Sequence, residues 1–142
     1  KGLYYAKKNK IKFSIIDYKN KIKAENKILL NLKNYKINLI CLAGFMKILS
    51  KKIVNKYKDR ILNIHPSLLP KYKGIDAVQQ ALDSNDKVTG CTVHYVNEEL
   101  DSGKIIDQST VMICPDDTIE TLTQRVQQAE HRLLPLVINS YE

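Results

Sequence analysis

This chain of 142 residues contains few cysteines and no long apolar run. The three cysteines, Cys41, Cys91 and Cys114, are scattered, odd in number and without CxxC spacing. This usage argues against a disulfide framework or a zinc site and favours reduced thiols in the cytoplasm. No stretch approaches the roughly 20 apolar residues that cross a bilayer, and no secretory signal opens the chain, so no membrane association is expected.

Acidic residues are also few: 15 Asp and Glu stand against 23 Lys and Arg, which gives a formal net charge of +8. Lysine is spread along the whole chain together with Asn and Ile, which indicates a compositional bias rather than a basic patch for nucleic acid. We therefore expect no nucleic-acid partner. The positive field would instead draw in small anionic substrates.

Repeats, low-complexity tracts and linkers rich in Pro, Gly or Ser are absent, so residues 1–142 are expected to form a single domain. The chain opens at "KGLYYAKKNKIKF" without Met, as a short helix leading into a strand. We therefore expect a first strand–helix unit to be missing ahead of Lys1.

Hydrophobic periodicity predicts alternating strands and helices. Strands are expected at 12–17, 38–44, 60–65, 91–97 and 105–113, and helices at 21–35, 49–57 and 76–84. A long amphipathic helix would follow, with Asp117 as its N-cap, Glu120 three residues later and a perturbation near Pro135.

This pattern predicts an α/β fold: an open, mostly parallel, doubly wound sheet with helices on both faces, antiparallel strands near the C-terminal part and a long C-terminal helix. Open sheets of this kind bind ligands beyond the carboxyl ends of their strands. The loops after Gly44 and after His65 fall there.

The stretch "ILNIHPSLLPKYKG" places Asn63 and His65 two residues apart at the end of a predicted strand, so both side chains share one face. An amide donor beside an imidazole can hold and polarise a carbonyl oxygen. The alternative is a structural pair that anchors the loop. In "HYVNEELDSGKII", Asp101 could favour the charged form of His65 and orient it, or it could be an ordinary turn residue.

Four fragments in register extend these observations: "LAGFMKILS", "LNIHPSLLPKYKG", "GCTVHYVNEELDSGKII" and "LTQRVQQAEHRLLPLVI". From about Asn38 to the end, the chain resembles the phosphoribosylglycinamide formyltransferases, folate-dependent enzymes of purine synthesis. The resemblance implies transfer of a formyl group from 10-formyltetrahydrofolate, as co-substrate, to the amine of glycinamide ribonucleotide. It implies small-molecule partners and a monomer or homodimer.

The resemblance also implies site residues. Asn63, His65 and Asp101 match the catalytic residues of the family. Folate binding would involve Met46, Lys47, Ile48, Leu49, Asn63, Asn97, Glu98, Glu99, Leu100, Asp101 and Lys21. Gln127 and Glu130 would contact the nucleotide substrate. Without the resemblance, residues 46–49 would be a hydrophobic cap on the core, and Glu130 could equally be a solvated residue on a helix face.

Metal ligation is not expected, because the histidines and Asp101 show none of the usual close spacings. His94 would be a pocket or packing residue, and His131 a helix-surface or core-edge residue. One departure from the family is that the five glycines form no Gly-rich turn for a phosphate. Such a turn is expected upstream of Lys1, unless the chain is a degenerate copy.

Three other functions stay open. A formyltetrahydrofolate deformylase would pass the formyl group to water, but such enzymes carry a second His where this chain has Pro66. A methionyl-tRNA formyltransferase would need a further tRNA-binding domain after Glu142. A non-catalytic module would keep the fold and bind only a folate or a nucleotide.

Overall fold

The computed structural model describes residues 2–141, which fall into two compact units, Lys1–Ile37 and Asn38–Glu142. The first unit holds helices α1 (Gly2–Lys8) and α2 (Lys21–Asn34). The side chain of Asn20 caps α2 by accepting a hydrogen bond from the backbone N–H of Lys23 at 3.0 Å. The predicted helix at 21–35 is confirmed.

The predicted strand at 12–17 is wrong. Residues 11–17 run without helix or strand structure, and the apolar residues Ile11, Phe13 and Ile15 are 60%, 47% and 67% exposed. Alternating apolar residues become a strand only when a neighbouring strand supplies hydrogen bonds. Within residues 2–141, no strand pairs with this segment.

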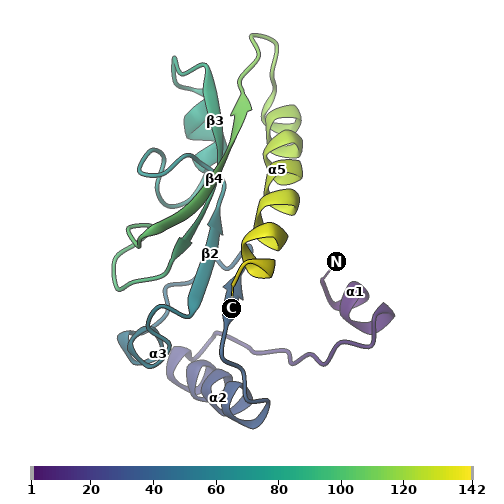
Figure 1. The fold of residues 1–142 in the computed structure, drawn as a ribbon, viewed down its shortest axis with the longest axis vertical. Coiled ribbons are helices and arrows are strands. Elements are labelled where there is room, and N and C mark those ends of the chain that lie inside the picture. The colour runs from purple at the N-terminus through teal and green to yellow at the C-terminus, as the bar shows by residue number, and fades with distance from the viewer. Residues whose placement is uncertain (1, 142) are drawn as a thin grey trace. The chain divides into compact units, whose positions relative to one another are not determined.

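The second unit is built on a four-stranded sheet in the order β1 (Ile40–Leu42), β2 (Ile61–His65), β3 (Val88–Tyr95) and β4 (Ile105–Met112) (Figure 1). Only β1 and β2 are parallel, joined through helix α3 (Lys51–Lys56); β3 is antiparallel to both β2 and β4. The sheet is therefore mixed and mostly antiparallel.

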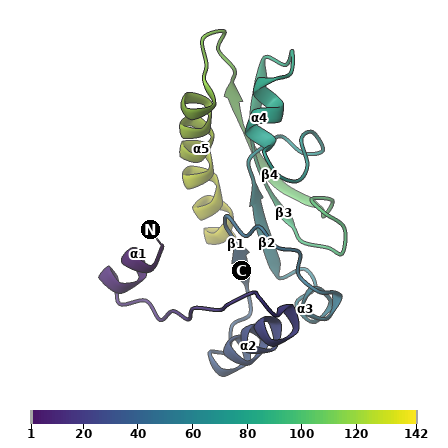
Figure 2. The same cartoon turned by 180° about the vertical axis from the view of Figure 1, so that it is seen from behind.

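The prediction of a mostly parallel sheet is wrong. Helix α4 (Ala77–Leu82) lies between β2 and β3 (Figure 2). It has six residues, as α3 has between the parallel strands β1 and β2, so helix length does not set strand direction. The alternation of a strand gives its two faces but not the direction in which it enters the sheet, and β3 enters antiparallel to β2. The open α/β class is confirmed, whereas the doubly wound arrangement stays a prediction.

The long C-terminal helix α5 (Ile119–Asn139) is confirmed and continues through Pro135. Its N-cap is Thr118, not Asp117 as predicted: the hydroxyl of Thr118 accepts from the N–H of Thr121, and the hydroxyl of Thr121 accepts from the N–H of Thr118. Asp117 is engaged elsewhere, because its carboxylate accepts from the N–H of Cys114 at 2.7 Å and pairs with Arg125.

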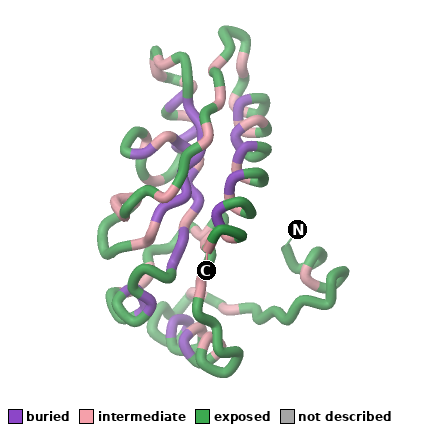
Figure 3. The backbone as a smooth tube through the Cα atoms, viewed as in Figure 1, coloured by how far each residue is buried: buried purple, intermediate pink, exposed green. Residues whose placement is uncertain are grey.

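The core lies between α5 and one face of the sheet. Its buried residues are Leu62, Ile64, Val78, Cys91, Val93, Leu122, Val126, Ala129, Leu133 and Val137, as Figure 3 shows along the inner side of α5. Five of them lie on α5 and recur at helical spacing in the sequence: Leu122, Val126, Ala129, Leu133 and Val137. Because side chains alternate along a strand, the neighbouring residues of β2 and β3 face the other side. None of the helices described is both long and apolar enough to cross a membrane.

Candidate active site

Strand pairing brings polar residues together on the face opposite α5. Asn63 of β2 is in register with His94 of β3, and the amide nitrogen of Asn63 lies 3.2 Å from Nε2 of His94. Nδ1 of His94 lies 2.8 Å from the carbonyl oxygen of Tyr95, which can only accept, so Nδ1 carries the proton and Nε2 accepts from Asn63. Burial lowers the pKa of His94, which favours the neutral imidazole that this arrangement requires.

Asp101 reaches this group from the loop between β3 and β4. Its Oδ1 lies 3.7 Å from Nε2 of His94, and its Oδ2 lies 3.5 Å from Nδ1 of His65. The N–H of Gly74 donates to Oδ2 at 2.8 Å. The loop returns tightly after Asp101, because a Cβ on Gly103 would lie 1.6 Å from the carbonyl oxygen of Tyr95. The loop thus holds the carboxylate between two imidazoles.

His65 is 5% exposed, and both of its ring nitrogens face protein groups. Nε2 lies 2.8 Å from the carbonyl oxygen of Tyr72 and must donate to it, so Nδ1 is the nitrogen that faces Asp101. The structure therefore brings the side chains of Asn63, His65 and Asp101 to one place, with His94 joining them.

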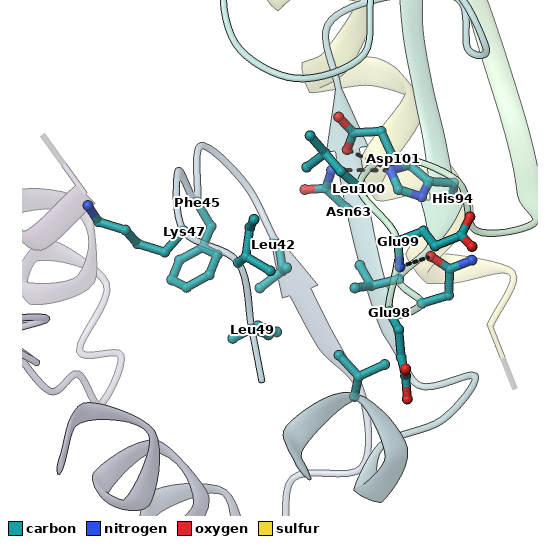
Figure 4. A pocket seen from close by; sticks show the side chains of 14 residues that line it. Leu42, Phe45, Lys47, Leu49, Asn63, His94, Glu98, Glu99, Leu100 and Asp101 are labelled. Atoms are coloured by element: carbon teal, nitrogen blue, oxygen red, sulfur yellow. Dashed lines mark hydrogen bonds and ion pairs between the residues drawn. The ribbon is translucent and has the colours of Figure 1, made fainter. Parts of the chain in front are cut away.

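A cleft opens beside this group (Figure 4). Its lining includes most of the residues expected to bind folate: Lys47, Ile48, Leu49, Asn63, Asn97, Glu98, Glu99, Leu100 and Asp101. It also includes five residues that were not expected there or were left open: Leu42, Phe45, Val54, His94 and Val96. Met46 is 69% exposed and is not among the lining residues, and neither is His65.

One wall of the cleft is fastened to α3. The carboxylate of Glu98 lies 2.7 Å from Nζ of Lys51 and accepts from the side-chain amide of Asn55 at 3.2 Å. The Lys51 ammonium and this amide hold the pKa of Glu98 below its usual range. The loop that carries Asp101 is therefore held at two points: Glu98 is bonded to α3, and Asp101 is bonded to the N–H of Gly74.

The remaining predicted residues lie elsewhere. Gln127 is exposed and Glu130 half-buried on α5, and neither lines the cleft; burial raises the pKa of Glu130 to about 6. Lys21 begins α2 in the other unit, and its predicted folate contact stays a prediction. His131 is exposed on α5. Among residues 2–141, no group of three or more His, Cys, Asp or Glu side chains is arranged to hold a metal ion.

His94 was predicted as a pocket or packing residue, and it lines the cleft, but its contact with Asn63 was not predicted. Its position on an alternating strand showed that it would face one side of the sheet. Which side, and opposite which residue, depended on the antiparallel register that sets Asn63 against His94. The sequence contains no local signal for that register.

Comparison with known proteins points to one group. The family described as Formyl transferase matches residues 1–138. The phosphoribosylglycinamide formyltransferase of Haemophilus influenzae is 41% identical over 96% of this chain and 66% of its own length. The human trifunctional purine biosynthetic protein adenosine-3 is 48% identical over 85% of this chain and 12% of its own length.

Solved structures agree. The phosphoribosylglycinamide formyltransferase of Anaplasma phagocytophilum is 41% identical with a TM-score of 0.92, covering 97% of this chain and 67% of the other. That of Brucella melitensis is 44% identical with a TM-score of 0.91, covering 99% and 73%. The chain spans about an eighth of the human relative and about two thirds of the bacterial one.

Proposed function

The chain belongs to the formyl transferase family, and on that premise we propose that it transfers a formyl group from 10-formyltetrahydrofolate to the amine of glycinamide ribonucleotide. The observation that carries the proposal is the convergence of Asn63, His65 and Asp101 beside a cleft. Relatives named as phosphoribosylglycinamide formyltransferases support the choice of acceptor, and the donor is the one that the family resemblance implies.

The proposed reaction is an acyl transfer. The lone pair of the substrate amine attacks the formyl carbon, and the electrons of the C=O bond move onto oxygen. In this proposal the resulting oxyanion accepts a hydrogen bond from the Asn63 amide, which has a second N–H besides the one directed at His94. His65 contributes indirectly, because its Nδ1 faces Asp101 and it does not line the cleft. Stabilisation of the developing charge is usually the largest single contribution to the rate enhancement. Removing one such donor raises the activation free energy by about 3 kcal/mol.

In the second half of the reaction the tetrahedral intermediate collapses. The C=O bond re-forms, the bond from the formyl carbon to N10 of the folate breaks, and the amine proton passes to N10 through a bound water. Nδ1 of His65 lies 3.5 Å from Oδ2 of Asp101, so the imidazole helps to hold this carboxylate beside Asn63 and His94. Asp101 also lines the cleft, where it can hold that water.

In this proposal the folate occupies the cleft. Leu42, Phe45 and Val54 give it an apolar wall, and the backbone of the 97–101 loop gives it polar groups. Gln127 and Glu130 would contact the nucleotide. The partners are thus small molecules, the cytoplasm is the proposed location, and a monomer or homodimer is the proposed assembly.

The test is formyl transfer by the full-length protein, measured as loss of 10-formyltetrahydrofolate with and without glycinamide ribonucleotide. We expect turnover only when the amine is present. Equal formate release with and without the amine would contradict the transferase and support the deformylase. Absence of turnover together with tight folate binding would support a non-catalytic module.

A further inference from the structure

The loop between β2 and α4 touches both proposed catalytic side chains through its backbone. The carbonyl oxygen of Tyr72 accepts from Nε2 of His65 at 2.8 Å, and the N–H of Gly74 donates to Asp101 at 2.8 Å. These two backbone groups are two residues apart. The conformation of residues 72–74 therefore fixes how the imidazole and the carboxylate face each other.

This short segment is held by a side-chain cluster outside the cleft. The hydroxyl of Tyr72 donates to Oδ2 of Asp86 at 2.7 Å, and Nζ of Lys71 lies 2.6 Å from the same oxygen. Both contacts lower the pKa of Asp86, the Lys71 ammonium first and the Tyr72 hydroxyl second. One carboxylate oxygen thus anchors two consecutive residues of the loop.

Asp86 is itself fixed to the rest of the fold. Its N–H donates to the hydroxyl of Ser84 at 3.1 Å, and that hydroxyl donates to the carbonyl of Ala81 in α4 at 2.7 Å. Ala81 is fully buried. A continuous set of contacts therefore joins the packed end of α4 to the Tyr72 carbonyl.

Tyr72 has a left-handed backbone with φ of +55°. This conformation is uncommon for residues other than Gly, Asn, Asp and His, and the contacts of Tyr72 stabilise it here. The hydroxyl of Ser67 supports the same turn from the other side by donating to the Lys71 carbonyl at 2.5 Å. The phenol–carboxylate contact and this turn together set the direction of the Tyr72 carbonyl.

We propose that Tyr72 and Asp86 are positioning residues that orient His65 and Asp101 for formyl transfer from outside the cleft. The inference rests on the proposed function, since it concerns how its two catalytic side chains are held. Neither residue lines the cleft. Their removal should therefore change the rate of the bound complex and not the affinity for either substrate.

The test uses Tyr72→Phe and Asp86→Ala in the full-length protein. Each should lower kcat by about tenfold and leave both KM values within about twofold, because a slightly misplaced catalytic group slows chemistry without loosening binding. Asp86→Asn keeps an oxygen acceptor for the Tyr72 hydroxyl and should recover most of kcat. Tyr141→Phe removes a tyrosine hydroxyl that donates to the Asp59 carbonyl and is the matched control, with unchanged kcat.

A double variant separates positioning from general destabilisation. Tyr72→Phe with Asp86→Ala should lose no more kcat than Asp86→Ala alone, because the Tyr72–Asp86 contact is already absent in Asp86→Ala. Additive losses, or losses that follow the unfolding temperature, would overturn the inference.

The two proposals fail differently. An active wild type that His65→Ala inactivates, with kcat unchanged in Tyr72→Phe, overturns the positioning role and leaves the proposed function standing. A wild type that transfers no formyl group, or one that His65→Ala leaves unchanged, overturns the proposed function and the positioning role with it.

Discussion

The two faces of the sheet in the Asn38–Glu142 unit differ in almost every respect. Toward α5, β2 and β3 present Leu62, Ile64, Cys91 and Val93, all in one buried cluster. On the other face the same strands present Asn63, His65, Thr92 and His94, which are hydrogen-bonded to one another or to loops. Each residue of one set is a sequence neighbour of a residue of the other.

The contrast shows how a short strand can serve stability and chemistry together. Successive side chains point to opposite faces, so the apolar residues that bury themselves under α5 also fix where the polar residues point. The polar face is covered by loops rather than by α5: Thr92 accepts from the N–H of Leu69, and Gln108 donates to the Leu69 carbonyl. Changes on the two faces should therefore have separable effects, on turnover for one and on unfolding for the other.

The largest effect is expected on the polar face, from Asp101→Asn. An asparagine keeps the shape and tolerates the φ of +46° at this position, but it brings an N–H₂ group and no charge to the imidazoles. We expect kcat/KM to fall by about a thousandfold, equivalent to about 4 kcal/mol. The unfolding temperature should change little.

The matched control for this change is Asp116→Asn, which alters an exposed aspartate in the turn before α5 and should leave kcat/KM unchanged. Steady-state rates of formyl transfer measure both variants. A loss of less than about tenfold in Asp101→Asn would show that the polar face does not depend on this carboxylate.

The next effect is expected on the apolar face, from Leu122→Ala. Leu122 is fully buried in the core, so its truncation should lower the free energy of unfolding by about 3 kcal/mol. Leu136→Ala on the same helix removes a side chain that is 66% exposed and should cost less than about 0.5 kcal/mol. Chemical denaturation measures both, and the folded Leu122→Ala protein should keep its kcat.

A smaller effect is expected where a carboxylate sits against the apolar face. Burial raises the pKa of Glu130 from 4.5 to about 6, so the folded protein holds its proton over a pH range in which the unfolded chain has released it. Stability should therefore fall as pH rises from 4.5 through 6. Glu130→Gln should be about 1 kcal/mol more stable than wild type at pH 8, after allowing for partial exposure, and equally stable at pH 4.

Glu120, at the start of the same helix, should have the opposite effect on how stability changes with pH. A hydrogen bond with Thr118 holds the pKa of Glu120 below its usual range, so its charged form stabilises the folded state. Glu120→Gln should therefore reduce stability at pH 8. If both glutamine variants shifted stability in the same direction, burial would not be the reason for the Glu130 effect.

The smallest effect is expected at the pair that fixes the start of α5. The Arg125 guanidinium and the N–H of Cys114 lower the pKa of Asp117 from 3.8 to about 2. Its stabilising contribution is therefore present above pH 3.8 and lost as pH falls through 2. Arg125→Met should be slightly less stable than wild type at pH 6, and the difference should shrink near pH 2 in a series of thermal melts.

Local sequence pattern was sufficient for much of this molecule. The strand at Ile61–His65 and the inner face of α5 follow from alternation and helical spacing, because each has a buried apolar side that specifies its direction. The segment at 12–17 shows a similar alternation and is no strand, because pairing depends on a neighbour and not on the segment itself. Strand direction likewise depends on pairing: β2 is parallel to β1 and antiparallel to β3, and alternation looks the same in either direction.

The candidate site divides in the same way. Asn63 and His65 share a face through their spacing alone, which the sequence shows directly. Two other groups reach His65 from loops. The Tyr72 carbonyl lies 7 residues further along the chain, and Asp101 lies 36 residues further, which is beyond the range of a local sequence pattern. The sequence offered Asp101 either as a partner of His65 or as a turn residue, and the resemblance to a known family favoured the first role.

The most direct measurement is the rate of formyl transfer to glycinamide ribonucleotide by the wild type and by His65→Ala. We predict transfer by the wild type and a loss of about a thousandfold in folded His65→Ala. Equal rates in the two folded proteins would contradict it, because the imidazole held between Tyr72 and Asp101 would then contribute nothing to the reaction.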